Sequence, residues 1–153
     1  MNKNISKSIE ISRELFPPIY NQKKRYRTYH FSFAWKKNKL LSIGQNIPHQ
    51  PSGKALKFAK MFKTPKTIKY PYLHSEVDMI SKLWGKTRVD GNIKVVSLRV
   101  NRFGKLCNSK PCKSCSTILS ALDISDIWWS NSDGKITEGN FVLDFAWLPV
   151  SCC

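Results

Sequence analysis

Hydrophobic and polar positions alternate along several stretches of the chain, and this alternation predicts β-strands. Residues 28–47 contain YHFSFAW, KKNK and LLSIGQNI in turn, which predicts a hairpin with a lysine-rich turn. Apolar β-rich runs at 93–100 (IKVVSLRV), 126–130 (DIWWS) and 141–150 (FVLDFAWLPV) predict three further strands. Turns are expected after the first two runs, at 101–104 and in NSDGK.

Helical spacing of apolar residues occurs near the N-terminus and again after the hairpin. The spacing over 5–16 predicts a short helix, which the pair Pro17-Pro18 is expected to end. A second helix is predicted over 52–62, with one apolar face and a stripe of lysines on the other. The expected buried face consists of Ala55, Leu56, Ala59 and Phe62, and the lysine stripe of Lys54, Lys57, Lys60 and Lys63. A proline-containing loop is expected over 63–71.

Two further helices are predicted in the middle of the chain. The first is expected to bury Leu73, Val77, Ile80 and Trp84, which recur at helical intervals. Asp78 and Lys82 would form an i,i+4 pair on its outer side, and Gly85 would lie at or just beyond its end. The second helix is expected to begin at Pro111, because proline suits the first turn. It would bury Cys115, Ile118, Leu119 and Leu122.

Strands alternate with helices in the middle of the chain, so the predicted fold class is α/β. At 153 residues the chain is expected to form a single domain over 1–153 with one core. A basic segment over 1–27 precedes the hairpin, and the tail over 148–153 is expected to fray.

The sequence contains no apolar run that approaches the roughly 18 residues of a membrane span. Its N-terminal residues lack the continuous apolar core of a secretory signal. We therefore expect a cytoplasmic protein without a membrane partner, whose five cysteines are thiols or metal ligands rather than disulfides. The closing Cys152-Cys153 resembles prenylated chain ends, but we assign it no function.

Charge is distributed unevenly along the chain. Lys and Arg total 26 against ten acidic residues, giving a formal net charge of +16. No carboxylate occurs from Leu15 to Ser75, where thirteen Lys and Arg residues fall, while five acids and only Lys135 follow from Asp123 onward. A basic half of this kind favours a polyanionic partner such as nucleic acid, although a solvated lysine-rich surface would look the same in sequence.

Two short segments, HSE at 74–76 and PCKSC at 111–115, supply candidate zinc ligands and a candidate proton carrier. The candidate ligands are His74, Cys112 and Cys115, which would hold one Zn²⁺ per chain. Three nitrogen and sulfur ligands leave one position for water, as catalytic zinc sites require. Glu76 can carry protons without touching the metal. The pattern H-x-E followed by P-C-x-x-C is the signature of zinc nucleobase deaminases.

Cys107 offers an alternative to this open site. It precedes Cys112 by five residues, so a fourth sulfur could close a structural zinc centre and leave Glu76 without a catalytic role. A second alternative is a pair of buried cysteines with no metal at all.

With these motifs in place, the chain resembles the cytidine and deoxycytidylate deaminase superfamily from about Thr28 to about Ser130. The resemblance implies a three-layer fold, with a central mixed sheet of about five strands flanked by helices. It also implies that Asn46, just after the second hairpin strand, holds the substrate sugar or base, and that backbone groups of Ser75 and Cys112 face the base. Ser75 stands where many members have alanine, and Ser109-Lys110 stands where many have an acid before the proline.

Two residues are candidates for further substrate contacts. Lys110, beside the metal-binding helix, would suit a phosphate. Trp128 and Trp129 end a strand on opposite faces, so at most one of them faces the site. We take Trp129 as the candidate for stacking on a base, with core packing as the alternative.

The reaction expected from these features is hydrolysis of the exocyclic C–N bond of cytosine, which yields uracil. Single-stranded nucleic acid, with DNA favoured, is the first substrate hypothesis because of the basic half of the chain. A free nucleotide or nucleoside such as dCMP or cytidine is the second. The third is a nucleic-acid-binding module with structural zinc. Adenine as the base, and the oligomeric state, stay open.

Overall fold

The structure is a computed structural model that describes residues 2–22, 28–64 and 71–139. The predicted strand at 141–150 and the tail at 148–153 lie outside the described residues, as does most of the loop over 63–71. The single domain over 1–153 therefore stays a prediction.

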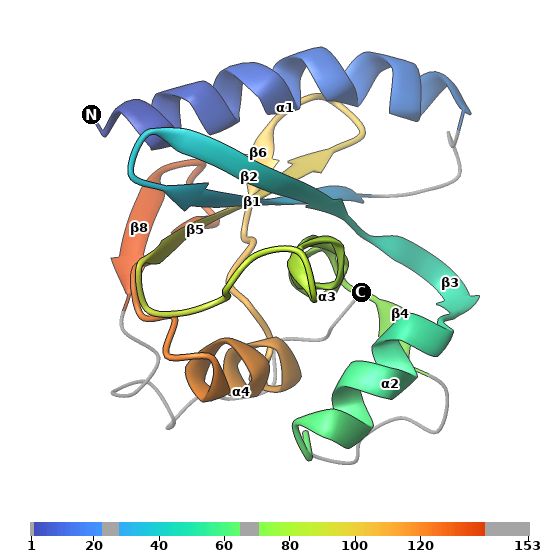
Figure 1. Ribbon diagram of the computed structural model, residues 1–153. Helices are drawn as coiled ribbons and strands as arrows, with labels where there is room; N and C mark the ends of the chain where they lie inside the picture. Colours follow the sequence, from blue (N-terminus) through green and yellow to red (C-terminus); the bar gives the residue numbers. More distant parts are fainter. Residues whose placement is uncertain (1, 23–27, 65–70, 140–153) are drawn as a thin grey trace.

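A six-stranded mixed sheet forms the centre of the molecule (Figure 1). Its strands are β1 (Thr28–Lys36), β2 (Lys39–Gln45), β5 (Ile93–Asn101), β6 (Leu106–Cys107), β7 (Ile127–Ser130) and β8 (Ile136–Gly139). The order is β2-β1-β5-β7-β8, and β6 pairs with the end of β5. Only β5 and β7 run parallel, and the other pairs are antiparallel. The predicted hairpin, its turn and the strands at 93–100 and 126–130 are confirmed.

Helices cover both faces of the sheet and make the three-layer α/β arrangement expected from the sequence (Figure 1). On one face lies α1 (Lys3–Gln22), and on the other lie α3 (Ser75–Leu83) and α4 (Lys113–Ala121). The helix α2 (Gly53–Met61) packs beside α3 and α4. The described helices contain no segment long and apolar enough to cross a membrane.

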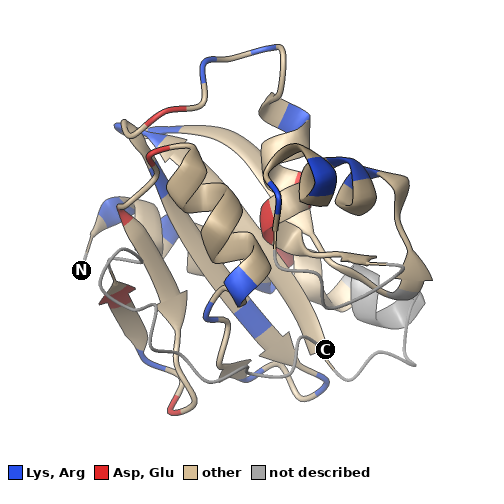
Figure 2. Cartoon of the chain, turned by 90° about the horizontal axis from the view of Figure 1, so that it is seen from below, with Lys and Arg blue, Asp and Glu red and all other residues tan. Residues whose placement is uncertain are grey.

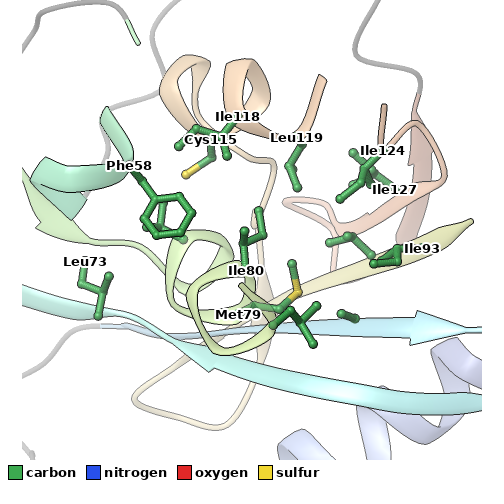
Figure 3. Packing of buried hydrophobic residues seen from close by; sticks show 14 of the residues in the cluster. Phe58, Leu73, Met79, Ile80, Ile93, Cys115, Ile118, Leu119, Ile124 and Ile127 are labelled. Atoms are coloured by element: carbon green, nitrogen blue, oxygen red, sulfur yellow. The ribbon is translucent and has the colours of Figure 1, made fainter. Parts of the chain in front are cut away.

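Strand alternation divides the buried side chains into two clusters. Tyr29 and Phe31 of β1 pack with Leu98 of β5 on the α1 side. Residues on the other face of β5 and on α3 and α4, such as Val95, pack together in the cluster of Figure 3. Because this second cluster includes Cys115, the residues that hold α4 against the sheet also fix one candidate ligand.

The N-terminal helix differs from the prediction. Helix α1 continues through Pro17-Pro18 and ends at Gln22, rather than ending at Phe16. A proline removes one helical hydrogen bond but has a helical φ, so packing elsewhere can maintain the helix. This packing includes Ile5, which is buried, and Phe16, whose ring meets that of Tyr29 edge to face at 5.4 Å.

The buried face of α2 also differs from the prediction. Ala55 and Phe58 are buried, whereas Leu56 is 38% exposed. Phe58 was not expected in this role, but its ring contacts those of Phe62 and Trp84 at 6.0 and 5.5 Å. Large aromatic rings bury more area than leucine, so they determine which face turns inward.

The two central helices begin later than predicted. Helix α3 begins at Ser75, and Leu73 lies in the short strand β4 (Tyr72–Leu73) before it. Helix α4 begins at Lys113 rather than Pro111, with Cys112 as its N-cap residue. The C-cap residue Trp84 is 39% exposed, so it extends the buried face less than expected.

Four short strands were not predicted from the sequence, among them β4 and β6. The strand β3 (Ile47–Pro51) pairs with β4 in a small second sheet, and β8 begins directly after the NSDGK turn. The passage from β2 into β3 is constrained by Gly44, where a Cβ atom would lie 1.9 Å from the Ser75 carbonyl oxygen. Only glycine allows α3 to approach β2 this closely.

Candidate active site

The candidate ligands lie where α3 and α4 begin. His74 is the N-cap residue of α3 and Cys112 that of α4, and neither side chain caps its own helix. Both side chains are therefore available to each other across the gap between the two helices. Cys115, one turn into α4, is buried. The helix N-termini add a positive field that favours thiolate over thiol.

The three side chains meet in the geometry of a metal site. Nδ1 of His74 lies 3.5 Å from Sγ of Cys112 and 3.3 Å from Sγ of Cys115. All three ligand atoms lie within 4.8 Å of one another. Tetrahedral zinc with ordinary Zn–N and Zn–S bonds would separate nitrogen and sulfur by about 3.6 Å. The spacing and the donor set therefore fit zinc.

The pKa of His74 depends on the charged groups around it. Burial lowers the pKa of His74, but the hydrogen bond to Cys112 and the charges of Cys112 and Glu76 outweigh it, so the net pKa is raised. An imidazole that shares a proton with a thiolate is a site that a cation can occupy by displacing that proton.

Cys107 takes no part in the cluster. Its Sγ donates to the carbonyl oxygen of Arg99 at 3.7 Å, and the group of possible metal ligands among the described residues contains only the other three side chains. Burial raises the pKa of the Cys107 thiol, which disfavours the thiolate that a metal needs. This geometry favours the open site over the closed one.

Serine hydroxyls hold the segment before the second helix against the sheet. Oγ of Ser109 donates to the carbonyl oxygen of Ser97 at 2.6 Å, and the backbone N–H of Ser130 donates to Oγ of Ser109 at 2.9 Å. Ser97 in the middle of β5 and Ser130 at the carboxyl end of β7 thus fix the segment that carries Cys112. Ligand sites in α/β sheets commonly lie at this end of the strands.

Glu76 lies in the first turn of α3 and is 1% exposed. Oγ of Ser75 approaches its Oε2 at 3.3 Å, and Oγ of Ser97 approaches its Oε1 at 3.4 Å. No Lys or Arg forms an ion pair with it among the described residues; the one basic group within 4 Å is His30, whose Nε2 lies 3.8 Å from Oε1. A buried carboxylate without a strong cationic partner is suited to accepting and releasing protons.

His30 was not singled out from the sequence. It lies on β1 and is buried, and its Nε2 lies 2.8 Å from Oγ of Ser97. Burial lowers its pKa to about 4, Glu76 raises it and Arg99 lowers it, so the ring is neutral at pH 7. The alternation of YHFSFAW was a usable signal, because it places His30 and Ser32 on the face opposite the aromatic residues.

One more hydroxyl, that of Ser32, completes the buried surroundings of the carboxylate. Oγ of Ser32 lies 2.7 Å from Oγ of Ser75 and 3.2 Å from Oγ of Ser97. All three serines are fully buried. The side chain of Ser75 is thus turned into the protein, and the expected contact of its backbone with the base stays a prediction.

Asn46 is buried next to the same strand. Its Oδ1 accepts from the backbone N–H of His30 at 2.8 Å, and the backbone N–H of Asn46 donates to the His30 carbonyl oxygen at 3.1 Å. This pair of bonds fixes the side-chain amide, so that the N–H groups on its Nδ2 are available for donation to another partner such as a substrate oxygen.

Lys110 and Trp129 lie together. Nζ of Lys110 lies over the Trp129 ring, 4.9 Å from its centroid. Trp129 packs in the cluster on the side of α3 and α4, whereas Trp128 packs on the α1 side, as strand alternation predicted. Since Trp129 is only 5% exposed, its stacking on a base stays a prediction.

Comparisons with known proteins agree with this architecture. No family model and no curated protein sequence matches the chain. The dCMP deaminase of the cyanophage S-TIM5 in complex with dCMP and dUMP is 19% identical, with a TM-score of 0.50 over 86% of this chain and 85% of that one. Its apo form has a TM-score of 0.47 and 16% identity over 86% of each chain. Cytidine deaminase from Mycobacterium leprae has a TM-score of 0.47 and 15% identity over 94% of this chain and 96% of that one. The likeness to the nucleotide-bound dCMP deaminase shows that the chain has this fold.

Proposed function

We propose that this protein is a zinc-dependent hydrolytic deaminase of the cytidine and deoxycytidylate deaminase superfamily, converting cytosine to uracil. One observation carries the proposal. Three zinc-type ligand atoms lie within 4.8 Å of one another, and a buried carboxylate follows the histidine ligand by two residues, on a fold shared with a dCMP deaminase. His74, Cys112 and Cys115 would hold the metal.

The chain's own residues would then manage the protons. Zinc, when bound, supplies a water activated near neutral pH. In the net reaction a C–O bond forms at the ring carbon, the exocyclic C–N bond breaks, and ammonia leaves. Glu76 would accept the proton that the water loses and deliver it to the ring nitrogen, and would then take a second proton from the added hydroxyl and pass it to the departing amine. The hydroxyls at 3.3 and 3.4 Å hold both oxygens of this carboxylate in place.

Asn46 would bind the substrate as a donor. Because its Oδ1 is engaged by His30, its Nδ2 is the group left to meet an oxygen of the sugar or base. Ser75 would contribute its backbone, since its hydroxyl faces Ser32.

Single-stranded nucleic acid, with DNA favoured, is the first candidate substrate. Figure 2, which looks onto the side of α2, α3 and α4, shows Lys and Arg along α2. Lys57 and Lys60 of the lysine stripe are exposed there. Nε of Arg99 is buried without a hydrogen-bond partner in the described part of the chain, and its charge lowers the pKa of His74, so it lies near the site. With Lys110, these cations favour a substrate that carries phosphate.

A free nucleotide is the second candidate. The observation that favours it is the likeness to a dCMP deaminase whose complex contains dCMP and dUMP. One phosphate would then engage Lys110 or Arg99, and the lysine stripe would have no part in binding.

A substrate panel separates the candidates. The zinc-loaded protein is incubated with single-stranded DNA, single-stranded RNA, dCMP and cytidine, and mass spectrometry follows the gain of about one dalton per deaminated base. Product from the polymers supports the first candidate, and product from dCMP alone supports the second. Zinc binding with no product from any of these substrates would contradict the proposed function.

A further inference from the structure

We propose that His30 is a positioning residue for Glu76, acting through the hydroxyl of Ser97. The inference rests on the proposed function, because it assigns a role in proton transfer. His30 and Glu76 come from different elements, β1 and α3, and they meet on the face of the sheet that carries the candidate ligands.

The contacts form a continuous chain. Nε2 of His30 lies 2.8 Å from Oγ of Ser97, which in turn lies 3.4 Å from Oε1 of Glu76. The direct distance from Nε2 to Oε1 is 3.8 Å, too long for a hydrogen bond. The serine hydroxyl therefore connects the imidazole with the carboxylate. All three side chains are buried, so bulk water does not compete for these bonds.

The hydrogen bonds between His30, Ser97 and Glu76 have a preferred direction of donation. A hydroxyl has one proton, so Ser97 can donate to Glu76 only if it accepts from His30. The carboxylate 3.8 Å away favours an N–H on Nε2 over a lone pair there. The expected arrangement is Nε2–H of His30 donating to Ser97, and Ser97 O–H donating to Oε1.

The backbone of His30 is also held in place. Both backbone groups of His30 bond to Asn46, the side-chain acceptor at 2.8 Å and the backbone donor at 3.1 Å. On β5 its cross-strand neighbour is Arg99, which pairs with it in register. The backbone of His30 is thus anchored by the residue proposed to bind the substrate, and its Nε2 lies 3.8 Å from the residue proposed to carry the proton.

A second hydroxyl chain reaches the other carboxylate oxygen. Ser32 contacts Ser75 at 2.7 Å, and Ser75 approaches Oε2 at 3.3 Å. Ser32 also lies 3.2 Å from Oγ of Ser97, so the two hydroxyl chains are linked, and loss of the His30 chain would remove one of the supports that fix the rotation of the carboxylate. A misaligned proton carrier lowers the rate of the chemical step more than it affects substrate binding.

Three variants test the inference. His30→Ala removes the donor and Ser97→Ala removes the link, while Ser8→Ala is the matched control. Ser8 is also fully buried, but it lies on α1 and accepts from Nε1 of Trp35 on the other side of the sheet. We expect His30→Ala and Ser97→Ala to lower kcat about 10- to 100-fold, with KM within about twofold and one zinc retained per chain. Ser8→Ala should keep the wild-type kcat.

A spectroscopic readout makes the test independent of activity. Nitrogen-15 NMR of the His30 ring in the zinc-loaded wild-type protein should show a neutral ring protonated at Nε2, with the Nε2–H signal shifted in both Ser97→Ala and Glu76→Gln. A ring protonated only at Nδ1 would overturn the inference, as would unchanged kcat in both His30→Ala and Ser97→Ala. If the wild-type protein deaminates nothing, the proposed function fails by itself, and the position of the ring proton still decides whether His30 holds Glu76.

Discussion

Sγ of Cys115 lies 3.3 Å from Nδ1 of His74, although 41 residues separate the two in sequence. Two helix starts, packed on one face of the sheet, bring them together. His74 is the N-cap residue of α3, but its side chain makes no capping hydrogen bond, and Cys115 lies inside α4 rather than at its cap position. The ligand cluster is therefore a product of tertiary packing.

Cysteine substitution distinguishes the open site from a closed one. Cys115→Ser should reduce the bound zinc to well below one per chain, because it removes a ligand from the cluster. Cys107→Ser is the matched control and should keep one zinc, since Cys107 instead contacts the Arg99 carbonyl oxygen. Metal content after dialysis, measured by atomic absorption, checks both. Equal zinc loss in the two variants would show that Cys107 is a fourth ligand.

Gly44 is expected to be intolerant of substitution. In Gly44→Ala the new Cβ would lie 1.9 Å from the Ser75 carbonyl oxygen and 2.4 Å from the Met79 nitrogen, both backbone atoms that cannot yield locally. The free energy of unfolding should fall by about 3 kcal/mol or more. Gly53→Ala is the control, because a Cβ there meets nothing within 4 Å. Urea denaturation of both variants measures the difference, and similar midpoints would contradict the close packing of α3 on β2.

Much of the fold could be predicted because local patterns coincide with the tertiary structure. The strands at 93–100 and 126–130 have residues that pack on both faces, and the ligand motifs lie at helix starts that proline and apolar spacing help to locate. The path of α1 through Pro17-Pro18 could not be predicted, since packing of the apolar face against the sheet outweighs the missing hydrogen bonds.

The role of His30 could not be predicted for a different reason. Strand alternation separates His30 and Ser32 from the aromatic residues of β1, and polar positions of this kind usually face solvent. Here α3 covers them, and the register of β1 with β5 brings His30 beside Ser97. Such information belongs to strand pairing, which one sequence does not specify. The pairing of β3 with β4 was missed for the same reason.

Stability should depend on pH through His30. Because its pKa is about 4 in the folded protein and about 6.5 when unfolded, the unfolded chain binds the extra proton first as pH falls. The free energy of unfolding should therefore decrease by about 3 kcal/mol from this group between pH 7 and pH 4. His30→Gln should lack this component. Urea denaturation with a chelator present, at several pH values, measures the difference in slope.

The comparison of slopes isolates His30 from other groups. Carboxylates, and His74 with its raised pKa, titrate in both proteins and largely cancel in the difference. Parallel pH profiles for the wild type and His30→Gln would show that the imidazole is not buried in its neutral form.

Lys110 is expected to contact phosphate. Lys110→Ala should weaken binding of single-stranded DNA and reduce the slope of log affinity against log salt by about one unit. Lys7→Ala is the control, because Lys7 is exposed on α1, on the opposite face of the sheet. Fluorescence anisotropy across a salt series gives both slopes. An unchanged slope in Lys110→Ala, or an equal reduction in Lys7→Ala, would contradict a specific contact.

The most direct test of the proposed function is a comparison of wild-type protein with Glu76→Gln, a variant that keeps the size of the side chain but cannot accept a proton. Both proteins should bind one zinc, because Glu76 is not among the clustered ligands. The measurement is ammonia release from the best substrate of the panel. We predict measurable turnover in the wild type and a loss of at least about 100-fold in the variant. Full activity in zinc-loaded Glu76→Gln would contradict the assignment of Glu76 as the proton carrier.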